Sequence, residues 1–223
     1  MTGRWSRWWR GASGERSGDG ALGQDERWVV VDVESTGLDA RRDRLLAIAA
    51  IAVHVQGGHA RIALGDSFDV VLRQPEAAQP PDKDNILLHG IGVGAQREGT
   101  EPREALLAFE RYLAGAPLIA FHAAFDETMI GRACRRWLQR KLPNEWVDLM
   151  PVARVLAPQV PAQTLDDWMA HFGIRCLQRH QAAADTLATA ELLLCLWPRL
   201  RAHGPAGFRT LRTLAAQSRW LPS

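Results

Sequence analysis

Apolar residues form short runs separated by turns in the first third of this chain, and recur at helical spacing in the rest. Val29 to Val33 and Leu45 to Val55 have the pattern of buried strands. Phe68 to Leu72 is expected to be a third strand, after a turn at Gly57-Gly58, and Leu118 to Phe121 a further short one. Strands early, followed by alternating strands and helices, predict an α/β sandwich with a mixed sheet.

Capping and breaking residues mark the helices. Proline in the first turn predicts a helix over 102–113. Thr164 and Asp167 have capping-box spacing and predict a helix over 165–172. The last long helix is expected to lose regularity at Pro198, because proline removes a backbone donor.

The chain divides by composition into three parts. Residues 1–26 are rich in Arg and Trp, then in Gly and Ser, and are expected to be a flexible leader. This leader could instead touch nucleic acid or a membrane surface. Residues 27–203 are the folded domain, and 204–223 a short C-terminal helical tail. In that tail, Gln217 to Leu221 has the form of a weak sliding-clamp-binding peptide.

Bulk composition excludes few classes of protein. The 223 residues suffice for one domain with a substantial core, and the net charge of +2 indicates no general attraction to nucleic acid. Only Lys83 and Lys141 are lysines among the 27 basic residues, a bias that base composition explains. The 3 cysteines fit no metal or disulfide motif, and no membrane span or signal peptide is visible. We expect a cytoplasmic protein with reduced cysteines and no membrane partner.

Asp32 and Glu34 end the first strand. Residues two apart on a strand point to the same side, so both carboxylates share one face. Two close carboxylates raise each other's pKa, and burying either ion is costly. A divalent cation removes both costs, and carboxylate oxygens are the ligands that Mg²⁺ and Mn²⁺ prefer. The alternative is an acidic turn facing solvent.

Two further acids and a histidine follow. Asp126 begins a helical pattern, where an acid also simply suits the helix dipole. His180 and Asp185 are five residues apart, so they can serve one site only if His180 lies in the loop before a helix and Asp185 in its first turns. Histidine is the side chain most easily used as a general base near neutral pH. The alternative is a loop histidine followed by an exposed helical Asp.

Three motifs together resemble the DEDDh branch of the DnaQ-like 3′→5′ exonucleases, which includes the proofreading epsilon subunit of bacterial DNA polymerase III. They are D-V-E-S-T-G at 32–37, F-H-A-A-F-D at 121–126 and H-Q-A-A-A-D at 180–185. The resemblance runs from about Trp28 to about Leu200. Secondary matches in the family's order are L-H-G-I at 88–91, V-D-L at 147–149, T-L at 164–165 and F-G-I at 172–174.

The resemblance implies a three-layer, ribonuclease H-like α/β fold with a mixed five-stranded sheet. It implies that Asp32, Glu34, Asp126 and Asp185 hold two divalent metal ions, Mg²⁺ or Mn²⁺. It assigns the role of catalytic base to His180.

The resemblance also suggests residues that contact the terminal nucleotide. These are Thr36 and Leu38, with Leu38 against the base, and, less strongly, His89 as a surface histidine at a turn. His122 stands where the family often has Asn, so its role in ordering substrate is an open question. Ser35 replaces a family Thr and keeps the hydroxyl.

The implied function is release of nucleoside 5′-monophosphates from the 3′ end of single-stranded DNA, with RNA as an open alternative. The partner is a nucleic acid with a free 3′ end, and a DNA polymerase or sliding clamp is a weaker candidate. Two rival functions are a non-catalytic nucleic-acid-binding or polymerase-associated module on the same fold, and a small-nucleotide phosphodiesterase.

Overall fold

A computed structural model describes residues 25–75 and 83–217 of the chain. The leader predicted for 1–26 lies outside the described residues, apart from its last two positions. The clamp-peptide prediction at 217–221 lies outside them too, apart from Gln217.

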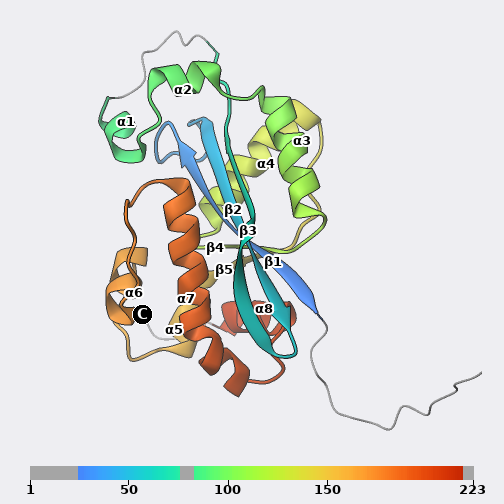
Figure 1. Cartoon of the computed structure of the whole chain (residues 1–223), viewed down its shortest axis with the longest axis vertical. Helices are drawn as coiled ribbons and strands as arrows, with labels where there is room; N and C mark the ends of the chain where they lie inside the picture. Colours follow the sequence, from blue (N-terminus) through green and yellow to red (C-terminus); the bar gives the residue numbers. More distant parts are fainter. Residues whose placement is uncertain (1–24, 76–82, 218–223) are drawn as a thin grey trace, which may run out of the picture.

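One mixed sheet in the order β3-β2-β1-β4-β5 organises the molecule (Figure 1). Its strands are β1 (Glu26–Ser35), β2 (Leu45–Gln56), β3 (His59–Val71), β4 (Leu118–Ala120) and β5 (Trp146–Asp148). β1, β2 and β3 are antiparallel neighbours, whereas β4 runs parallel to both β1 and β5. The predicted mixed five-stranded sheet is confirmed.

β3 is longer than the predicted strand at Phe68 to Leu72 and begins directly after the turn at Gly57-Gly58, where both φ angles are positive. Its pairing with β2 shifts between Ile51 and Ala52. Because β3 is an edge strand with many exposed positions, its first half needs no apolar run, and the pattern of hydrophobic residues missed it.

The other main elements of the described chain are helices. They are α1 (Lys83–His89), α2 (Val93–Glu98), α3 (Pro102–Leu113), α4 (Ala124–Leu138), α5 (Leu149–Leu156), α6 (Leu165–Phe172), α7 (Ala182–Ala202) and α8 (Phe208–Gln217). α3 and α6 have their predicted bounds. The capping box is present, since Thr164 accepts the Asp167 N–H and Asp167 accepts the Thr164 N–H.

The prediction for Pro198 was wrong. α7 continues through it to Ala202, although proline cannot donate to the carbonyl of Leu194. Trp197 and Leu200, on either side of the proline, are both buried in the core. Packing of this apolar face keeps the helix regular where local propensity would end it.

The sheet separates two hydrophobic cores. α5, α6, α7 and α8 contribute to the core on one face, while α3 and α4 pack on the other (Figure 1). β1 alternates between them: Trp28 and Val30 belong to the α7 side, Val29 and Val31 to the α3 side. This alternation directs the even-numbered Asp32 and Glu34 toward α7.

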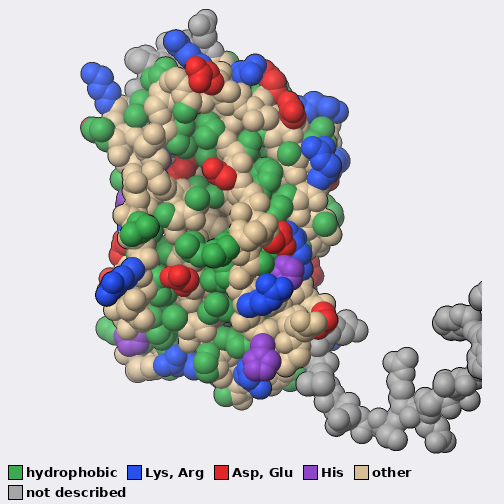
Figure 2. All heavy atoms as spheres, in the orientation of Figure 1, with side chains coloured by type: hydrophobic (Ala, Val, Ile, Leu, Met, Phe, Trp, Pro, Cys, Tyr) green, Lys and Arg blue, Asp and Glu red, His purple; other side chains and the backbone are tan. Residues whose placement is uncertain are grey.

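The surface carries no single-sign field over the face shown in Figure 2. Hydrophobic side chains are spread across this face, and Lys and Arg lie mainly along its edges (Figure 2). Among the described residues, no helix is both long and apolar enough to cross a bilayer.

Candidate active site

Two carboxylates lie on one side of β1 near its carboxyl end. Asp32 and Glu34 are partly buried there, beside the start of α7. The backbone N–H of Ala182, the first residue of α7, hydrogen-bonds Glu34. The strand end and the helix start are therefore joined through one of the predicted metal ligands.

Two helix N-termini bring the other acids to the same place. Asp126 is 4% exposed in the first turn of α4, and Asp185 is 7% exposed in the first turn of α7. The N-terminal end of a helix favours negative charge, which eases the burial of both groups. β1, α4 and α7 thus bring the four acids together. The first and the last of them, Asp32 and Asp185, are 153 residues apart in the sequence.

Burial without a cation makes Asp32, Glu34 and Asp126 hard to ionise. Burial raises the pKa of Glu34 to about 8, with the charge of Asp185 adding to the effect. Burial also raises the pKa of Asp126 to about 8. The pKa of Asp32 is raised well above its usual value by burial, and further by Asp126 and Glu34. Mutual influence of this kind shows that the four acids form one electrostatic cluster.

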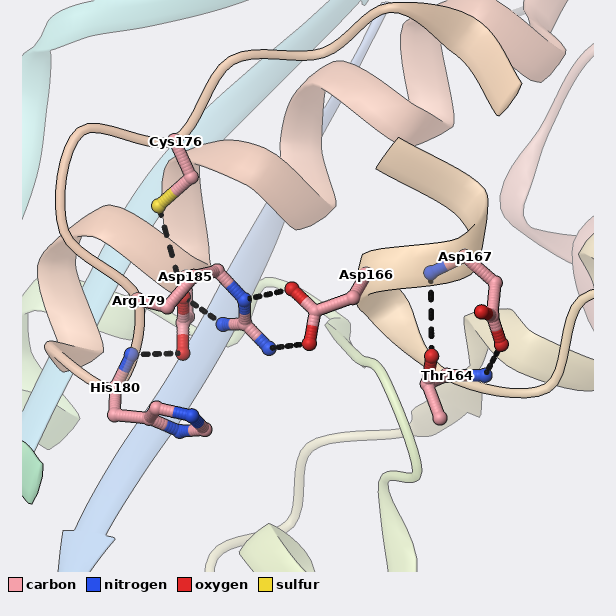
Figure 3. Close-up of polar contacts among 7 residues, drawn as sticks. All are labelled: Thr164, Asp166, Asp167, Cys176, Arg179, His180 and Asp185. Atoms are coloured by element: carbon pink, nitrogen blue, oxygen red, sulfur yellow. Dashed lines mark hydrogen bonds and ion pairs between the residues drawn. The ribbon is translucent and has the colours of Figure 1, made fainter. Parts of the chain in front are cut away.

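The loop before α7 surrounds Asp185 with donors (Figure 3). The backbone N–H of His180 donates to Oδ2 of Asp185 at 3.1 Å, and the Cys176 thiol lies 3.8 Å from Oδ1. His180 has φ of 61°, which L-residues seldom adopt, and its ring is directed away from the carboxylate (Figure 3). His180 therefore lies just outside the helix and Asp185 inside it, the arrangement that a shared site needs.

Arg179 is a site residue that the sequence reasoning missed. Its guanidinium forms an ion pair with Asp185 and a second one with Asp166 of α6, where Nε lies 2.6 Å from Oδ1 (Figure 3). An arginine beside a histidine carries no periodic or motif signal. Only the folded position of α6 shows that the side chain joins two helices.

The loop after β1 holds the predicted substrate residues. The Thr36 hydroxyl donates to Asp43 at 3.0 Å and accepts the Arg44 N–H at 2.9 Å. A Cβ at Gly37 would lie 2.6 Å from Oδ2 of the same Asp43, so any other residue there would displace this carboxylate. These contacts fix the loop, and the side chain of Leu38 projects from it with 92% exposed.

The predicted histidines of the pocket differ in their surroundings. His122 is exposed, with φ of 61°, and its backbone N–H donates to Asp148 at 2.9 Å. His89 was predicted to be a surface residue and is 2% exposed, so that prediction was wrong. Its Nδ1 accepts the Ile91 N–H at 2.9 Å, and burial lowers its pKa. A neutral, buried His89 stabilises its turn.

A basic cleft of about 420 Å³ is lined in part by Asp43 and Arg44 of the loop after β1. Its charged and aromatic lining consists of Asp43, Arg44, Arg73, Arg132, Arg135, Arg136 and Trp137. Arg136 lies 5.0 Å over the ring of Trp137, and Arg132 donates to the backbone carbonyl of Asp43 at 3.0 Å. The cleft therefore shares Asp43 with the loop that carries Thr36.

The acidic cluster has the kind of donor atoms that divalent cations take. It consists of four carboxylates, the oxygen ligands that Mg²⁺ and Mn²⁺ take, and burial raises the pKa of Asp32, Glu34 and Asp126. Within 25–75 and 83–217, no group of three His, Cys, Asp or Glu side chains is close enough together in this arrangement to hold one ion. Both oxygens of Asp185 are occupied by protein donors.

The acid-lined site lies at the end of the central strand of a mixed sheet. Residues 29–193 match the RNase T exonuclease family model, so the chain belongs to this family of DnaQ-like exonucleases.

Relatives come from bacterial replication proteins. A PolC-type DNA polymerase III of Oceanobacillus iheyensis is 30% identical over 176 residues, covering 79% of this chain and 12% of the relative. A DNA polymerase III subunit epsilon-like protein of Rhodobacter capsulatus is 29% identical over 205 residues, covering 89% of this chain and 28% of the relative. The chain thus spans only a small part of the length of these relatives.

Solved structures share the fold. E. coli exonuclease I in complex with a dA16 oligonucleotide is similar with a TM-score of 0.62 at 20% identity, covering 80% of this chain and 43% of that chain. The predicted ribonuclease H-like class of fold is thereby confirmed.

Proposed function

We propose that this protein is a metal-dependent 3′→5′ exonuclease that releases nucleoside 5′-monophosphates from single-stranded DNA. The observation that carries this proposal is the cluster of Asp32, Glu34, Asp126 and Asp185, in which burial raises the pKa of Asp32, Glu34 and Asp126. Membership of the exonuclease family supports the same reaction.

The four acids would hold two Mg²⁺ or Mn²⁺ ions. Such a pair supplies stabilisation of the attacking and leaving oxygens of an in-line displacement. His180, in the loop before α7, takes a proton from the attacking water, a role in which histidine is common. Water adds to phosphorus, the 3′ oxygen of the preceding nucleotide leaves, and a 5′-monophosphate is released.

The strand is held by the loop after β1 and by the basic cleft. Leu38 presents its exposed apolar side chain to the terminal base, and Thr36 and His122 are the polar residues that would contact the terminal nucleotide. Arg135 and Arg136, beside the exposed Trp137, suit phosphates and bases of a longer strand. A cleft of this kind favours a polymer over a small nucleotide. E. coli exonuclease I is a related fold solved with single-stranded DNA.

End specificity tests the proposal. A linear strand labelled at its 5′ end should be shortened stepwise in Mg²⁺, and a 3′-blocked or circular strand should resist. Internal cuts in the circle would make the protein an endonuclease, and no cleavage of any strand would support the non-catalytic module. Faster hydrolysis of a nitrophenyl nucleotide ester than of an oligonucleotide would instead identify a small-nucleotide phosphodiesterase.

We further propose a polymerase as the partner of this domain, because the relatives named above are DNA polymerase III proteins. Co-purification of this protein with the polymerase subunit of the same organism tests this proposal. Isolated exonuclease domain, added as a competitor, should displace it from the polymerase.

A further inference from the structure

Arg179 lies between the carboxylates of Asp185 and Asp166, which have different roles. One arm of its guanidinium contacts Asp185, a predicted metal ligand, and the other contacts Asp166, which no catalytic role requires (Figure 3). Nη2 lies 3.4 Å from the second oxygen of Asp166, so this contact is a two-point one. The side chain is 24% exposed, whereas that of Asp166 is 60% exposed.

The contact with Asp185 uses the same atoms that a metal ion needs. Arg179 and the Cys176 thiol occupy Oδ1, and the His180 N–H occupies Oδ2. A divalent cation bound to Asp185 would stand where a guanidinium now supplies positive charge. Two cations cannot share one carboxylate oxygen cheaply at this distance, because like charges repel strongly where water is scarce.

Asp166 is a second anionic partner for the Arg179 guanidinium. It projects from the first turn of α6, whose start is fixed by the capping box of Thr164 and Asp167 (Figure 3). Arg179 can therefore release Asp185 without losing an anionic partner. Its backbone is directly bonded to His180, whose N–H is itself on Asp185, so a shift of Arg179 also alters the loop that carries the predicted base.

We propose that Arg179 is a positioning residue that holds Asp185 when no metal is bound and moves onto Asp166 alone when a divalent cation takes the carboxylate. In this way the side chain sets the metal affinity of the site and couples metal binding to the position of His180. The inference rests on the proposed metal-dependent function.

Two substitutions change the partners of Asp185 and Arg179 in different ways and should move metal affinity in opposite directions. Arg179→Gln frees Asp185, so Mn²⁺ titrated into metal-free protein should bind more tightly, on the order of ten-fold. Asp166→Asn leaves the guanidinium with Asp185 as its only anion, so Mn²⁺ should bind more weakly by a similar factor. Calorimetry with the metal alone measures both, without substrate or turnover.

Matched controls separate the contact from bulk charge. Arg175→Gln removes a positive charge from the same loop, and Glu191→Gln removes a negative charge from α7, the helix that carries Asp185. Both controls should change the affinity for Mn²⁺ less than half as much, on a logarithmic scale, as their partners at 179 and 166. Equal shifts in the controls would overturn the proposal in favour of general electrostatics.

Hydrogen exchange of the loop gives a second readout. In the wild-type protein, Mn²⁺ should change amide exchange over residues 175–181, and in Arg179→Gln this response should largely disappear. If Arg179→Gln instead bound Mn²⁺ more weakly, Arg179 would be needed to hold Asp185 in place for the metal. That result would overturn the proposal that Arg179 moves from Asp185 to Asp166. Since these tests need no nuclease activity, a failure of the exonuclease proposal would appear separately, as Mn²⁺ binding without strand cleavage.

Discussion

The carboxylate of Asp126 accepts a hydrogen bond from the backbone of Val33, the residue between Asp32 and Glu34. The start of α4 is therefore tied to the central strand between two of the other acids. Glu34 is tied in the same way to the start of α7 through Ala182. Backbone donors of the scaffold thus orient the acids before any ion binds, as a preorganised site requires.

The first prediction concerns Asp32. Replacing it by Ala or Asn should reduce nuclease activity to background, because the acid whose pKa is raised by all three others is lost from the metal site. The fold should remain, with free energy of unfolding in metal-free buffer unchanged or higher, because like-charge repulsion falls. Urea unfolding and an oligonucleotide assay measure the two effects. An Asp32→Ala protein that degrades DNA at a rate near that of the wild type would contradict the assignment.

The second prediction is a pH dependence of stability without metal. Both Glu34 and Asp126 have a folded-state pKa of about 8, above that in the unfolded chain. Between about pH 4 and pH 8 the folded state therefore holds more protons, and stability falls as pH rises. The free energy of unfolding should drop by a few kcal/mol, as an order of magnitude, over this window.

Urea unfolding in EDTA at pH 5 and pH 8 measures that drop. Excess Mg²⁺ should remove most of it, and so should the double variant Glu34→Gln with Asp126→Asn. Stability that rises with pH in EDTA would show that the cluster is ionised and well solvated, contrary to its burial.

Local sequence signals predicted much of the fold, because several helices have strong start signals and the central strands are continuous apolar runs. α3 and α6 have strong start signals, Pro102 and the Thr164–Asp167 capping box, and both were predicted at their observed bounds. β1 and β2 are buried in the middle of the sheet, so continuous apolar runs marked them. β3 at the edge and the passage of α7 through Pro198 depend on tertiary packing, which no local window contains.

The site divides in the same way. Asp32 and Glu34 could be paired from strand periodicity alone, and a helix start placed Asp126. The burial of His89 could not be predicted, since a lone histidine at a turn has no periodic pattern. The double contact of Arg179 requires α6 and α7 to lie side by side, a relationship set by the core around Trp168 and Leu192.

The third prediction concerns the basic cleft. Arg135→Ala with Arg136→Ala should weaken binding of a long single strand about ten-fold and make the salt dependence shallower by about one unit in the log–log slope. Arg201→Ala with Arg209→Ala, which remove two exposed arginines elsewhere, is the matched control. Fluorescence anisotropy in EDTA measures binding without cleavage. A dinucleotide should be hydrolysed normally by the cleft variant, and equal loss in both double variants would deny the cleft a special role.

The last prediction concerns the base. His180→Ala should lower turnover by about 10²–10⁴, the usual contribution of a general base. Affinity for Mn²⁺ should change little, because His180 is not proposed as a ligand and the backbone N–H that contacts Asp185 persists in the variant. The acidic limb of the rate–pH profile should flatten, leaving only a dependence from metal-water ionisation. His122→Ala, at the other left-handed histidine, is the control and should keep the acidic limb. If His180→Ala lost metal affinity but kept its turnover at saturating Mn²⁺, His180 would be a ligand, and another residue would have to accept the proton.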